Sequence, residues 1–305
     1  MFLLSEISYK AGIKNVEFIN ENETDELFIP FKGSSFPDVR GGVFLSDKRY
    51  LPLMDSDSVC MVVTLPELAQ DVLNLKKGVC ITSSPKEIFY KCHNYIARRG
   101  LYNRHRQETV VGRECRIEPD ARVASENVII GDNVIIGSGV KIYENTFIGS
   151  NVQIDDGVII GNRAFDVRNF GGKPLPLFPS GGVKICDGVQ IFSNCYIDRA
   201  TFPSEFTEIG EDSILGVGCH IGHAVHIGSR VQMVAQSLVA GYTLVGDDVS
   251  IGTNVFIADR LKIGEGVSIS AGSVVVTNVG KGTHMTGNYA MEHSEFIKEY
   301  ARKKM

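Results

Sequence analysis

Large aliphatic side chains recur at every sixth position through most of the second half of the chain. Four positions after each of them stands a small or β-branched residue, with Leu261 as the exception. An α-helix repeats about every 3.6 residues and a strand about every 2, so neither element alone explains the pattern. The uninterrupted run consists of Ile209, Leu215, Ile221, Ile227, Met233, Val239, Val245, Ile251, Ile257, Ile263 and Ile269.

The period of six predicts a mainly β protein built as a parallel β-helix, in which short strands and sharp turns form stacked coils. Three hexads would make one triangular coil of about 18 residues, with the aliphatic side chains inside and small residues beside the corners. At roughly 4.8 Å per stacked strand, about seven coils would give a prism of about 35 Å. Two shorter runs continue the pattern, namely Ile130, Ile136, Ile142, Ile148, Ile154, Ile160 and then Ile185, Ile191, Ile197.

Two segments interrupt this period. Residues 161–184 contain two Gly-Gly pairs and three prolines, so we expect no regular strand there. Long loops on rigid scaffolds often carry function, and we therefore interpret this excursion as a flap beside a site. Residues 198–208 are a smaller irregularity, in which Pro203 falls on an aliphatic position and should distort that edge.

The two ends lack the hexad. Residues 1–105 combine helical patterns with short apolar strands and predict a small α/β domain, followed by the β-helix over 106–281. Residues 282–305 form a C-terminal extension in which we expect one short helix. A basic stretch, which we interpret as a solvated linker, joins the first domain to the prism and contains Arg98, Arg99, Arg104 and Arg106.

Composition limits the class of protein without naming a chemistry. The 305 residues carry 31 basic and 36 acidic side chains, and this net charge of −5 argues against non-specific nucleic-acid binding. No apolar run reaches the roughly 18 residues that span a bilayer, and the N-terminus does not look like a signal peptide. The seven cysteines show no paired spacing, so free thiols and a cytoplasmic location are expected.

Candidate chemistry comes from residues spaced by one coil. His223, Gly241 and Asp259 all occupy the third hexad position, which is a corner. A neutral histidine can take a proton from an attacking amine, which contributes about 10²–10⁴ in rate. The N–H of a glycine one coil away could stabilise the negative charge on a thioester carbonyl. The pair therefore predicts acyl transfer, with a solvated bystander histidine as the alternative.

The repeat [Ile/Leu/Val]-Gly-x-x-x-x resembles that of the hexapeptide-repeat acyltransferases. The resemblance implies coils that wind left-handed and a homotrimer. Some hexapeptide-repeat proteins are instead carbonic anhydrases, whose three zinc-binding histidines come from two subunits. His220, His223 and His226 stand three residues apart, but only His223 falls on a corner. The other two should lie on flat faces of successive sides, so a zinc enzyme is the less favoured alternative and we expect no metal.

A closer resemblance covers nearly the whole chain and points to the UDP-3-O-acylglucosamine N-acyltransferases of lipid A synthesis. Residues 194–199 (NCYIDR) and 221–228 (IGHAVHIG) are similar to that family's "TIDRG … QI(A/G)HNV.IG". The resemblance places His223 on the family's catalytic base and Gly241 on the residue that supplies the oxyanion-hole N–H. It also implies that His220, Asp259 and Arg260 lie near the acyl donor or behind the base.

The N-terminal segment 44–50 (FLSDKRY) resembles the family's "FL.NPKY", which binds uracil. This resemblance implies that Phe44 and Tyr50 sandwich the base and that Asp47 stands at the hydrogen-bonding position. Aromatic faces suit such stacking, although both could equally be ordinary core residues. The first domain would then bind the uridine of a nucleotide sugar.

The resemblance implies an N-acyltransferase that moves an acyl group from an acyl carrier protein, or from coenzyme A, to the amine of a UDP-linked amino sugar. No permanently bound cofactor is implied. Asp47 replaces an amide of the family's motif, and residues 215–217 (LGV) replace the "IDN" that usually precedes the catalytic histidine. A relative that uses coenzyme A thioesters on another nucleotide-linked amino sugar, for surface glycans, is therefore an alternative. A non-catalytic scaffold is another.

Overall fold

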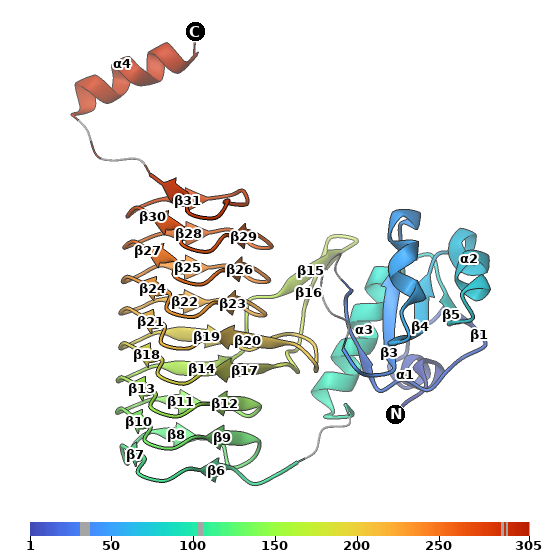
Figure 1. Cartoon of the computed structure of the whole chain (residues 1–305). Helices are drawn as coiled ribbons and strands as arrows, with labels where there is room; N and C mark the ends of the chain where they lie inside the picture. Colours follow the sequence, from blue (N-terminus) through green and yellow to red (C-terminus); the bar gives the residue numbers. More distant parts are fainter. Residues whose placement is uncertain (31–36, 103–105, 288–289, 291, 305) are drawn as a thin grey trace.

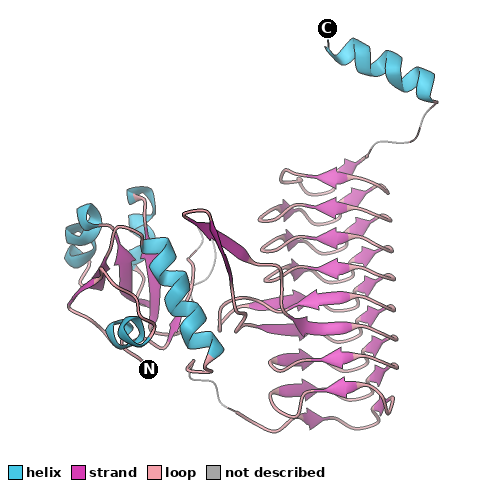
Figure 2. Ribbon diagram, turned by 180° about the vertical axis from the view of Figure 1, so that it is seen from behind, coloured by secondary structure: helices cyan, strands magenta, loops and turns pink. Residues whose placement is uncertain are grey.

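The structure is a computed structural model and describes residues 1–30, 37–102, 106–287, 290 and 292–304. Figure 1 shows an N-terminal α/β unit beside a prism of stacked strands, with a short helix after the last coil. A hairpin leaves the prism at mid-height and extends toward the N-terminal unit (Figure 2). This hairpin belongs to the excursion that interrupts the repeat.

The N-terminal unit is a five-stranded sheet in the order β1-β5-β4-β3-β2, in which β1 is antiparallel to β5 and the other neighbours are parallel. Its longest helix, α3, begins with Pro85 at a position where the missing N–H costs no hydrogen bond. Phe89 and Ile96 on this helix are fully buried in the core of the unit. The elements are α1 (Leu4–Lys10), β1 (Glu17–Ile19), β2 (Glu26–Leu27), β3 (Gly41–Leu45), the 3₁₀ helix η1 (Lys48–Asp55), β4 (Val59–Thr64), η2 (Pro66–Leu68), α2 (Ala69–Asn74), β5 (Gly78–Ile81) and α3 (Pro85–Arg98).

The prism has three faces, each a parallel sheet that receives one short strand from every coil. The β6 face holds β6 (Val110–Val111), β9 (Val128–Ile130), β12 (Thr146–Ile148), β17 (Gly182–Ile185), β20 (Phe206–Ile209), β23 (His226–Ile227), β26 (Leu244–Val245) and β29 (Lys262–Ile263). The β7 face holds β7 (Arg116–Ile117), β10 (Ile135–Ile136), β13 (Gln153–Ile154), β18 (Gln190–Ile191), β21 (Ile214–Leu215), β24 (Gln232–Met233), β27 (Ser250–Ile251), β30 (Ser268–Ile269) and β32 (His284–Met285). The β8 face holds β8 (Arg122–Val123), β11 (Lys141–Ile142), β14 (Ile159–Asn162), β19 (Tyr196–Asp198), β22 (His220–Ile221), β25 (Leu238–Val239), β28 (Phe256–Ile257) and β31 (Val274–Val275).

The hexad aliphatics fill the interior of the prism, as the period predicts. Ile221, Val239 and Ile257 stack in register on three successive coils and are completely buried. The β8 and β6 faces each have eight strands and the β7 face has nine, so the expectation of about seven coils was too low. Strands at both ends, such as β6 and β31, extend the stack by continuing the six-residue spacing, with Val111 six residues before Ile117 and Val275 six residues after Ile269.

Sharp corners join the three faces. The second residue of many corner turns has a left-handed backbone, as in Asn194 (φ 59°) and Asn254 (φ 56°). Asparagine tolerates this conformation better than most residues. A β-turn whose second central residue has a positive φ reverses the chain in few residues. The sequence therefore supplies both the interior side chains and the corner residues that a coil needs.

The excursion contains two regular strands, so the expectation of no strand there was wrong. β15 (Val167–Phe170) and β16 (Lys173–Pro176) form an antiparallel hairpin that turns at Gly171 and Gly172, both with positive φ. Proline disrupts a central strand because it lacks an N–H, but a two-stranded ribbon has only edge strands and tolerates Pro174 and Pro176. The glycines and prolines that suggested irregularity therefore mark a hairpin.

The excursion and the 198–208 segment attach the prism to the N-terminal unit. His93 on α3 is fully buried and lies 2.8 Å from the Tyr102 hydroxyl and 2.9 Å from the Phe178 carbonyl oxygen. Phe202 is completely buried and lies 4.6 Å from the His93 ring, within the N-terminal core. The segment around Pro203 therefore leaves the regular coil of the prism and packs into the core of the N-terminal unit.

The predicted C-terminal helix is present as α4 (His293–Lys304). In the part of the chain that the structure describes, no helix has the length and apolar character needed to cross a membrane. All seven cysteines are free thiols.

Candidate active site

His223 and Gly241 occupy the same corner of the prism on successive coils. A Cβ atom placed on Gly241 would lie 2.5 Å from Cε1 and 2.8 Å from Nε2 of His223, so the imidazole rests directly on the glycine backbone. The N–H of Tyr242 donates to the His223 carbonyl oxygen at 2.9 Å and fixes this stacking. The structure thus brings together the two residues that the 18-residue spacing pairs.

The backbone amide of Gly241 makes no hydrogen bond within the described part of the chain. The amides of His223 and Asp259, at the same position of neighbouring coils, are equally unused, so this is a property of the corner. Gly241 differs because it has no side chain, and the His223 imidazole occupies the space that a Cβ would fill.

Burial controls the charge of His223, whose side chain is 16% exposed. Burial lowers the pKa of this imidazole below its ordinary value, while the negative charges of Asp166 and Asp198 act in the opposite direction. His223 is therefore neutral near pH 7, which is the form that accepts a proton.

Asp166 is the carboxylate that lies beside the His223 imidazole, and the sequence analysis did not identify it. It lies just before β15 in the excursion, is 4% exposed, and places Oδ2 3.7 Å from Nε2 of His223. The Thr201 hydroxyl donates to Oδ2 at 2.9 Å, and an Arg168 guanidinium nitrogen lies 2.9 Å from Oδ1. The excursion thus lies beside the candidate site, as expected of a flap. No multiple of the coil length joins Asp166 to His223, so the period could not find it.

Tyr242 forms a second wall of the site. Its ring stands edge-on to the His223 imidazole, with centroids 5.1 Å apart, and its hydroxyl donates to Glu205 Oε2 at 3.3 Å. Burial raises the pKa of Glu205 to about 8, so this carboxyl is mostly protonated at neutral pH. Tyr242 adopts a positive φ of 60°, the same left-handed conformation that corner residues such as Asn254 have.

Asp259 and Arg260 follow at the same corner one coil further on. Arg260 places its guanidinium carbon 4.9 Å from the centre of the Tyr242 ring, and its Nε lies 3.5 Å from Asp259 Oδ2. Both side chains are exposed, so this end of the corner faces solvent. Their assignment to the acyl donor stays a prediction.

His220 forms a separate pair with a different acid. Its Nε2 lies 2.8 Å from Oδ2 of the buried Asp198, whose Oδ1 accepts a hydrogen bond from Asn162 Nδ2 at 2.9 Å. The hydrogen bond to Asp198 raises the pKa of His220, whereas burial lowers that of His223. Two histidines three residues apart are therefore shifted in opposite directions.

The three closely spaced histidines do not converge. His220 lies on the β8 face and His226 on the β6 face, where its Nδ1 is 3.3 Å from Glu208 Oε2. Within the described ranges, no group of three or more histidine, cysteine, aspartate or glutamate side chains is arranged to hold a metal ion.

The predicted nucleobase residues lie around the end of strand β3. Phe44 is on β3 and packs against Phe89 and Tyr90 of α3, with ring centroids 5.1 and 6.1 Å away. Asp47 caps η1 by accepting the Arg49 backbone N–H at 2.9 Å, and hydrogen bonds from Arg49 lower its pKa. Tyr50 is 53% exposed. The structure thus places one aromatic against the core and the other toward solvent, and their role in binding a base stays a prediction.

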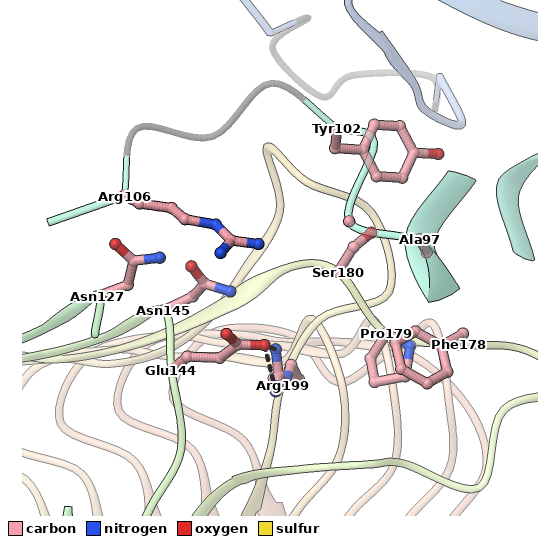
Figure 3. Close-up of a pocket in the computed structure, with 11 residues that line it drawn as sticks. Ala97, Tyr102, Arg106, Asn127, Glu144, Asn145, Phe178, Pro179, Ser180 and Arg199 are labelled. Carbon is pink, nitrogen blue, oxygen red and sulfur yellow. Dashed lines mark hydrogen bonds and ion pairs between the residues drawn. The ribbon is translucent and has the colours of Figure 1, made fainter. Parts of the chain in front are cut away.

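A separate pocket lies where the linker meets the prism and contains neither His223 nor Gly241 (Figure 3). It encloses about 110 Å³. Arg106 from the linker extends toward Asn145, and Arg199 reaches Glu144 at 3.4 Å. Arg104 of the predicted basic linker lies outside the described residues, as does the predicted domain boundary at residue 105.

No protein-family model matches the chain, and neither does any curated protein. Among solved structures, the UDP-N-acetylglucosamine acyltransferase from Campylobacter jejuni aligns with 64% of this chain and 79% of its own, at 22% identity and a TM-score of 0.53. LpxA from Acinetobacter baumannii aligns with 63% of this chain and 76% of its own, at 26% identity and a TM-score of 0.39. The Arabidopsis UDP-N-acetylglucosamine acyltransferase aligns with 63% and 73%, at 21% identity and a TM-score of 0.39.

The Campylobacter likeness shows a shared fold. The class of structure is therefore a β-helix of stacked parallel strands, of the kind that this acyltransferase has. The hand of the coils and the narrower resemblance to the N-acyltransferases of lipid A synthesis stay predictions.

Proposed function

We propose that the protein is an N-acyltransferase that uses the corner of His223 and Gly241 to transfer an acyl group from a thioester to the amine of a UDP-linked amino sugar. The observation that carries the proposal is the imidazole of His223 seated on the bare backbone of Gly241, with the buried carboxyl of Asp166 beside it. The fold shared with an acyltransferase is compatible with this reaction.

The geometry supports a simple sequence of steps. The neutral His223 takes a proton as the sugar amine attacks the thioester carbonyl, and Asp166 stabilises the imidazolium that forms. The Gly241 N–H donates to the carbonyl oxygen as it becomes negative. The C–S bond then breaks, the imidazolium returns its proton to the leaving thiolate, and the amide and free thiol are released.

Several finer features belong to the same proposal. The coils wind left-handed, the protein is a cytoplasmic homotrimer, and Phe44, Asp47 and Tyr50 hold the uracil. The donor is an acyl carrier protein thioester, as in UDP-3-O-acylglucosamine N-acyltransferases, or a coenzyme A thioester with another nucleotide-linked amino sugar. His220, Asp259 and Arg260 are placed near the donor in this proposal.

Thiol release tests the reaction directly. The purified protein is incubated with UDP-linked amino sugars and with acetyl-CoA, 3-hydroxyacyl-CoA or acyl carrier protein thioesters, and the amide product is identified by mass spectrometry. His223→Ala should lower turnover by at least about 10²-fold. His226→Ala is the matched control, because this exposed histidine lies on another face three residues away. Near-normal turnover by His223→Ala, with the assembly intact, would overturn the assignment.

A further inference from the structure

The pocket between the linker and the prism has a polar end and an apolar end. Arg106 extends from the linker toward Asn145 at one end, and Phe178 and Pro179 form the other (Figure 3). Its volume of about 110 Å³ is well below the roughly 300–1,000 Å³ of pockets that hold drug-sized ligands. The pocket is therefore too small for a nucleotide sugar or coenzyme A and suits a molecule of a few heavy atoms.

The pocket lies apart from the candidate active site. Asn145 and His223 are on the same edge of the prism, where the corners after β11, β14, β19 and β22 follow one another. The two residues are therefore three coils apart, which is about 14 Å at the spacing of stacked strands. A ligand beside Asn145 would bind away from the proposed base.

Arg199 is a nearly buried cation with a poorly matched partner. Its side chain is 11% exposed, and both of its terminal nitrogens reach the same atom, Glu144 Oε1, at 3.4 and 3.5 Å. Arg230, in contrast, bonds to the two oxygens of Asp248 at 2.7 and 2.8 Å. Nε of Arg199 donates to the Gly161 carbonyl oxygen at 2.9 Å, which fixes the guanidinium. Each terminal nitrogen carries a second hydrogen, for which the described residues offer no acceptor.

Further hydrogen-bond donors stand at the polar end. Arg106 makes no ion pair or hydrogen bond with any residue that the structure describes. Asn127 Oδ1 accepts the Gln107 N–H at 3.0 Å, so the Nδ2 group of Asn127 remains a donor. Asn145 stacks on Asn127 through its own N–H, which donates to the Asn127 carbonyl oxygen at 2.7 Å. The polar end thus offers N–H groups from two guanidinium groups and two amides.

The charges of the lining select a monoanion. Arg106 and Arg199 are two cations against the single carboxylate of Glu144, so one positive charge is left over. A carboxylate ligand would cancel this charge, and its planar pair of oxygens matches the fork of a guanidinium. A phosphate would bring a second negative charge beside Glu144. The apolar end at Phe178 and Pro179 suits a short hydrocarbon chain.

We propose that this pocket binds a short-chain aliphatic carboxylate, with the carboxylate directed toward Arg106 and Arg199 and the hydrocarbon chain against Phe178 and Pro179. This site is separate from the acyl-transfer site and does not depend on the proposed function.

The pocket is also connected to the contact that attaches the N-terminal unit to the prism. Tyr102 and Phe178 line it, and both are held by the buried His93, whose ring nitrogens lie 2.8 Å from the Tyr102 hydroxyl and 2.9 Å from the Phe178 carbonyl oxygen. A ligand in the pocket would contact the linker and the prism together. Because such a ligand binds only the folded arrangement, it should raise the melting temperature.

Ligand-observed NMR titration at constant ionic strength tests the site with acetate, propionate and butyrate, and with propylamine and inorganic phosphate for comparison. We expect butyrate to bind saturably and to raise the melting temperature. Each methylene that the pocket buries should tighten binding by about fourfold from acetate to butyrate. Propylamine and phosphate should bind at least about tenfold more weakly than butyrate.

Two variants locate the ligand. Arg106→Gln removes a cation and Asn145→Asp adds a like charge, so each should weaken butyrate binding by about tenfold or more. Aspartate tolerates the left-handed backbone of Asn145, and the melting temperature without ligand confirms that each variant is folded. Arg302→Gln and Asn254→Asp are the matched controls, because they make the same changes at an exposed arginine of α4 and at another left-handed corner.

The controls should bind butyrate as the unaltered protein does. Absence of saturable carboxylate binding, or tighter binding of phosphate or propylamine than of butyrate, would overturn the proposal. Full butyrate affinity in folded Arg106→Gln and Asn145→Asp would also overturn it, because the ligand would then lie elsewhere. His223→Ala should keep butyrate binding, so failure of the acyl-transfer assay and failure of this site are distinguishable.

Discussion

Nε2 of His223 lies 3.7 Å from Oδ2 of Asp166, although the two residues belong to different kinds of structure. The histidine sits in a regular corner of the prism, whereas the aspartate enters from the excursion that breaks the repeat. Thr201 and Arg168 hold the carboxylate from two further directions. An interruption of the solenoid therefore supplies the charge that a proton-accepting imidazole needs.

This relationship predicts the effect of Asp166→Asn. The negative charge of Asp166 raises the pKa of His223, so its removal should lower that pKa further and shift the acidic limb of the kcat/KM profile to lower pH. The plateau should fall by about 10²-fold or more, because the imidazolium loses its stabilising partner. The measurement is a pH–rate profile of thiol release.

Glu208→Gln is the control for this experiment, because Glu208 is the partner of the exposed His226 and should leave both the plateau and the limb in place. A profile for Asp166→Asn that overlays that of the unaltered protein would show that Asp166 has no part in the chemistry.

Gly241→Ala tests the second half of the candidate site. The new Cβ would lie within 3 Å of three ring atoms of His223, so the imidazole must move away from the backbone amide. Gly241 does not have a positive φ, so alanine fits the backbone and the prism should keep its melting temperature. We expect kcat to fall by about 10²-fold, which is the usual cost of a damaged oxyanion site.

Gly280→Ala serves as the comparison, because a Cβ there would meet only the Thr283 hydroxyl at 3.6 Å, an ordinary contact. Equal activities of the two alanine variants would argue against a catalytic role for this corner.

The sequence predicted the parts of the molecule that repeat. The six-residue period identifies the prism, its interior and the stacking of His223 on Gly241, because each coil of regular length brings residues 18 apart into register. Where a coil is longer than 18 residues, counting 18 residues no longer identifies the partner on the next coil. Tyr196 pairs with His220, and these residues are 24 apart because the 198–208 segment adds an extra stretch to the coil.

The other residues of the candidate site could not be found in this way. The non-repeating segments contain Asp166, Arg168 and Glu205. The positions of these residues depend on how the β15–β16 hairpin and the 198–208 segment, which contains Phe202, pack against α3. Such packing is a tertiary effect that no local pattern encodes. The Asp198–His220 pair was missed for a related reason, since the two residues lie on strands of neighbouring coils separated by the same irregular stretch.

Glu205 predicts a specific dependence of stability on pH. Its pKa is about 8 in the folded protein and near its ordinary value of 4.5 in the unfolded chain, so the folded state binds more protons between these values. Stability contributed by this group is therefore full below pH 4.5 and is lost as the pH rises toward 8. Between pH 5 and pH 9 the unaltered protein should lose on the order of 1–3 kcal/mol of its free energy of unfolding through this group. Glu205→Gln should not show this loss, so the variant should be the more stable of the two proteins at pH 9. Urea denaturation of both proteins at the two pH values measures the difference, and parallel pH dependences would contradict it.

The His220–Asp198 pair predicts a pH effect that is carried by a raised histidine pKa. The hydrogen bond that His220 donates to Asp198 raises the pKa of His220 in the folded state, so the pair contributes stability below the unfolded pKa and loses it as the pH rises through the folded value. Asp198→Asn should therefore lower the His220 pKa measured by NMR and destabilise the protein more at pH 5 than at pH 9. Glu208→Gln again provides the comparison, because it alters the exposed His226 and should leave the His220 titration unchanged. If the His220 resonance titrates identically in the Asp198→Asn protein, the contact at 2.8 Å does not set its charge.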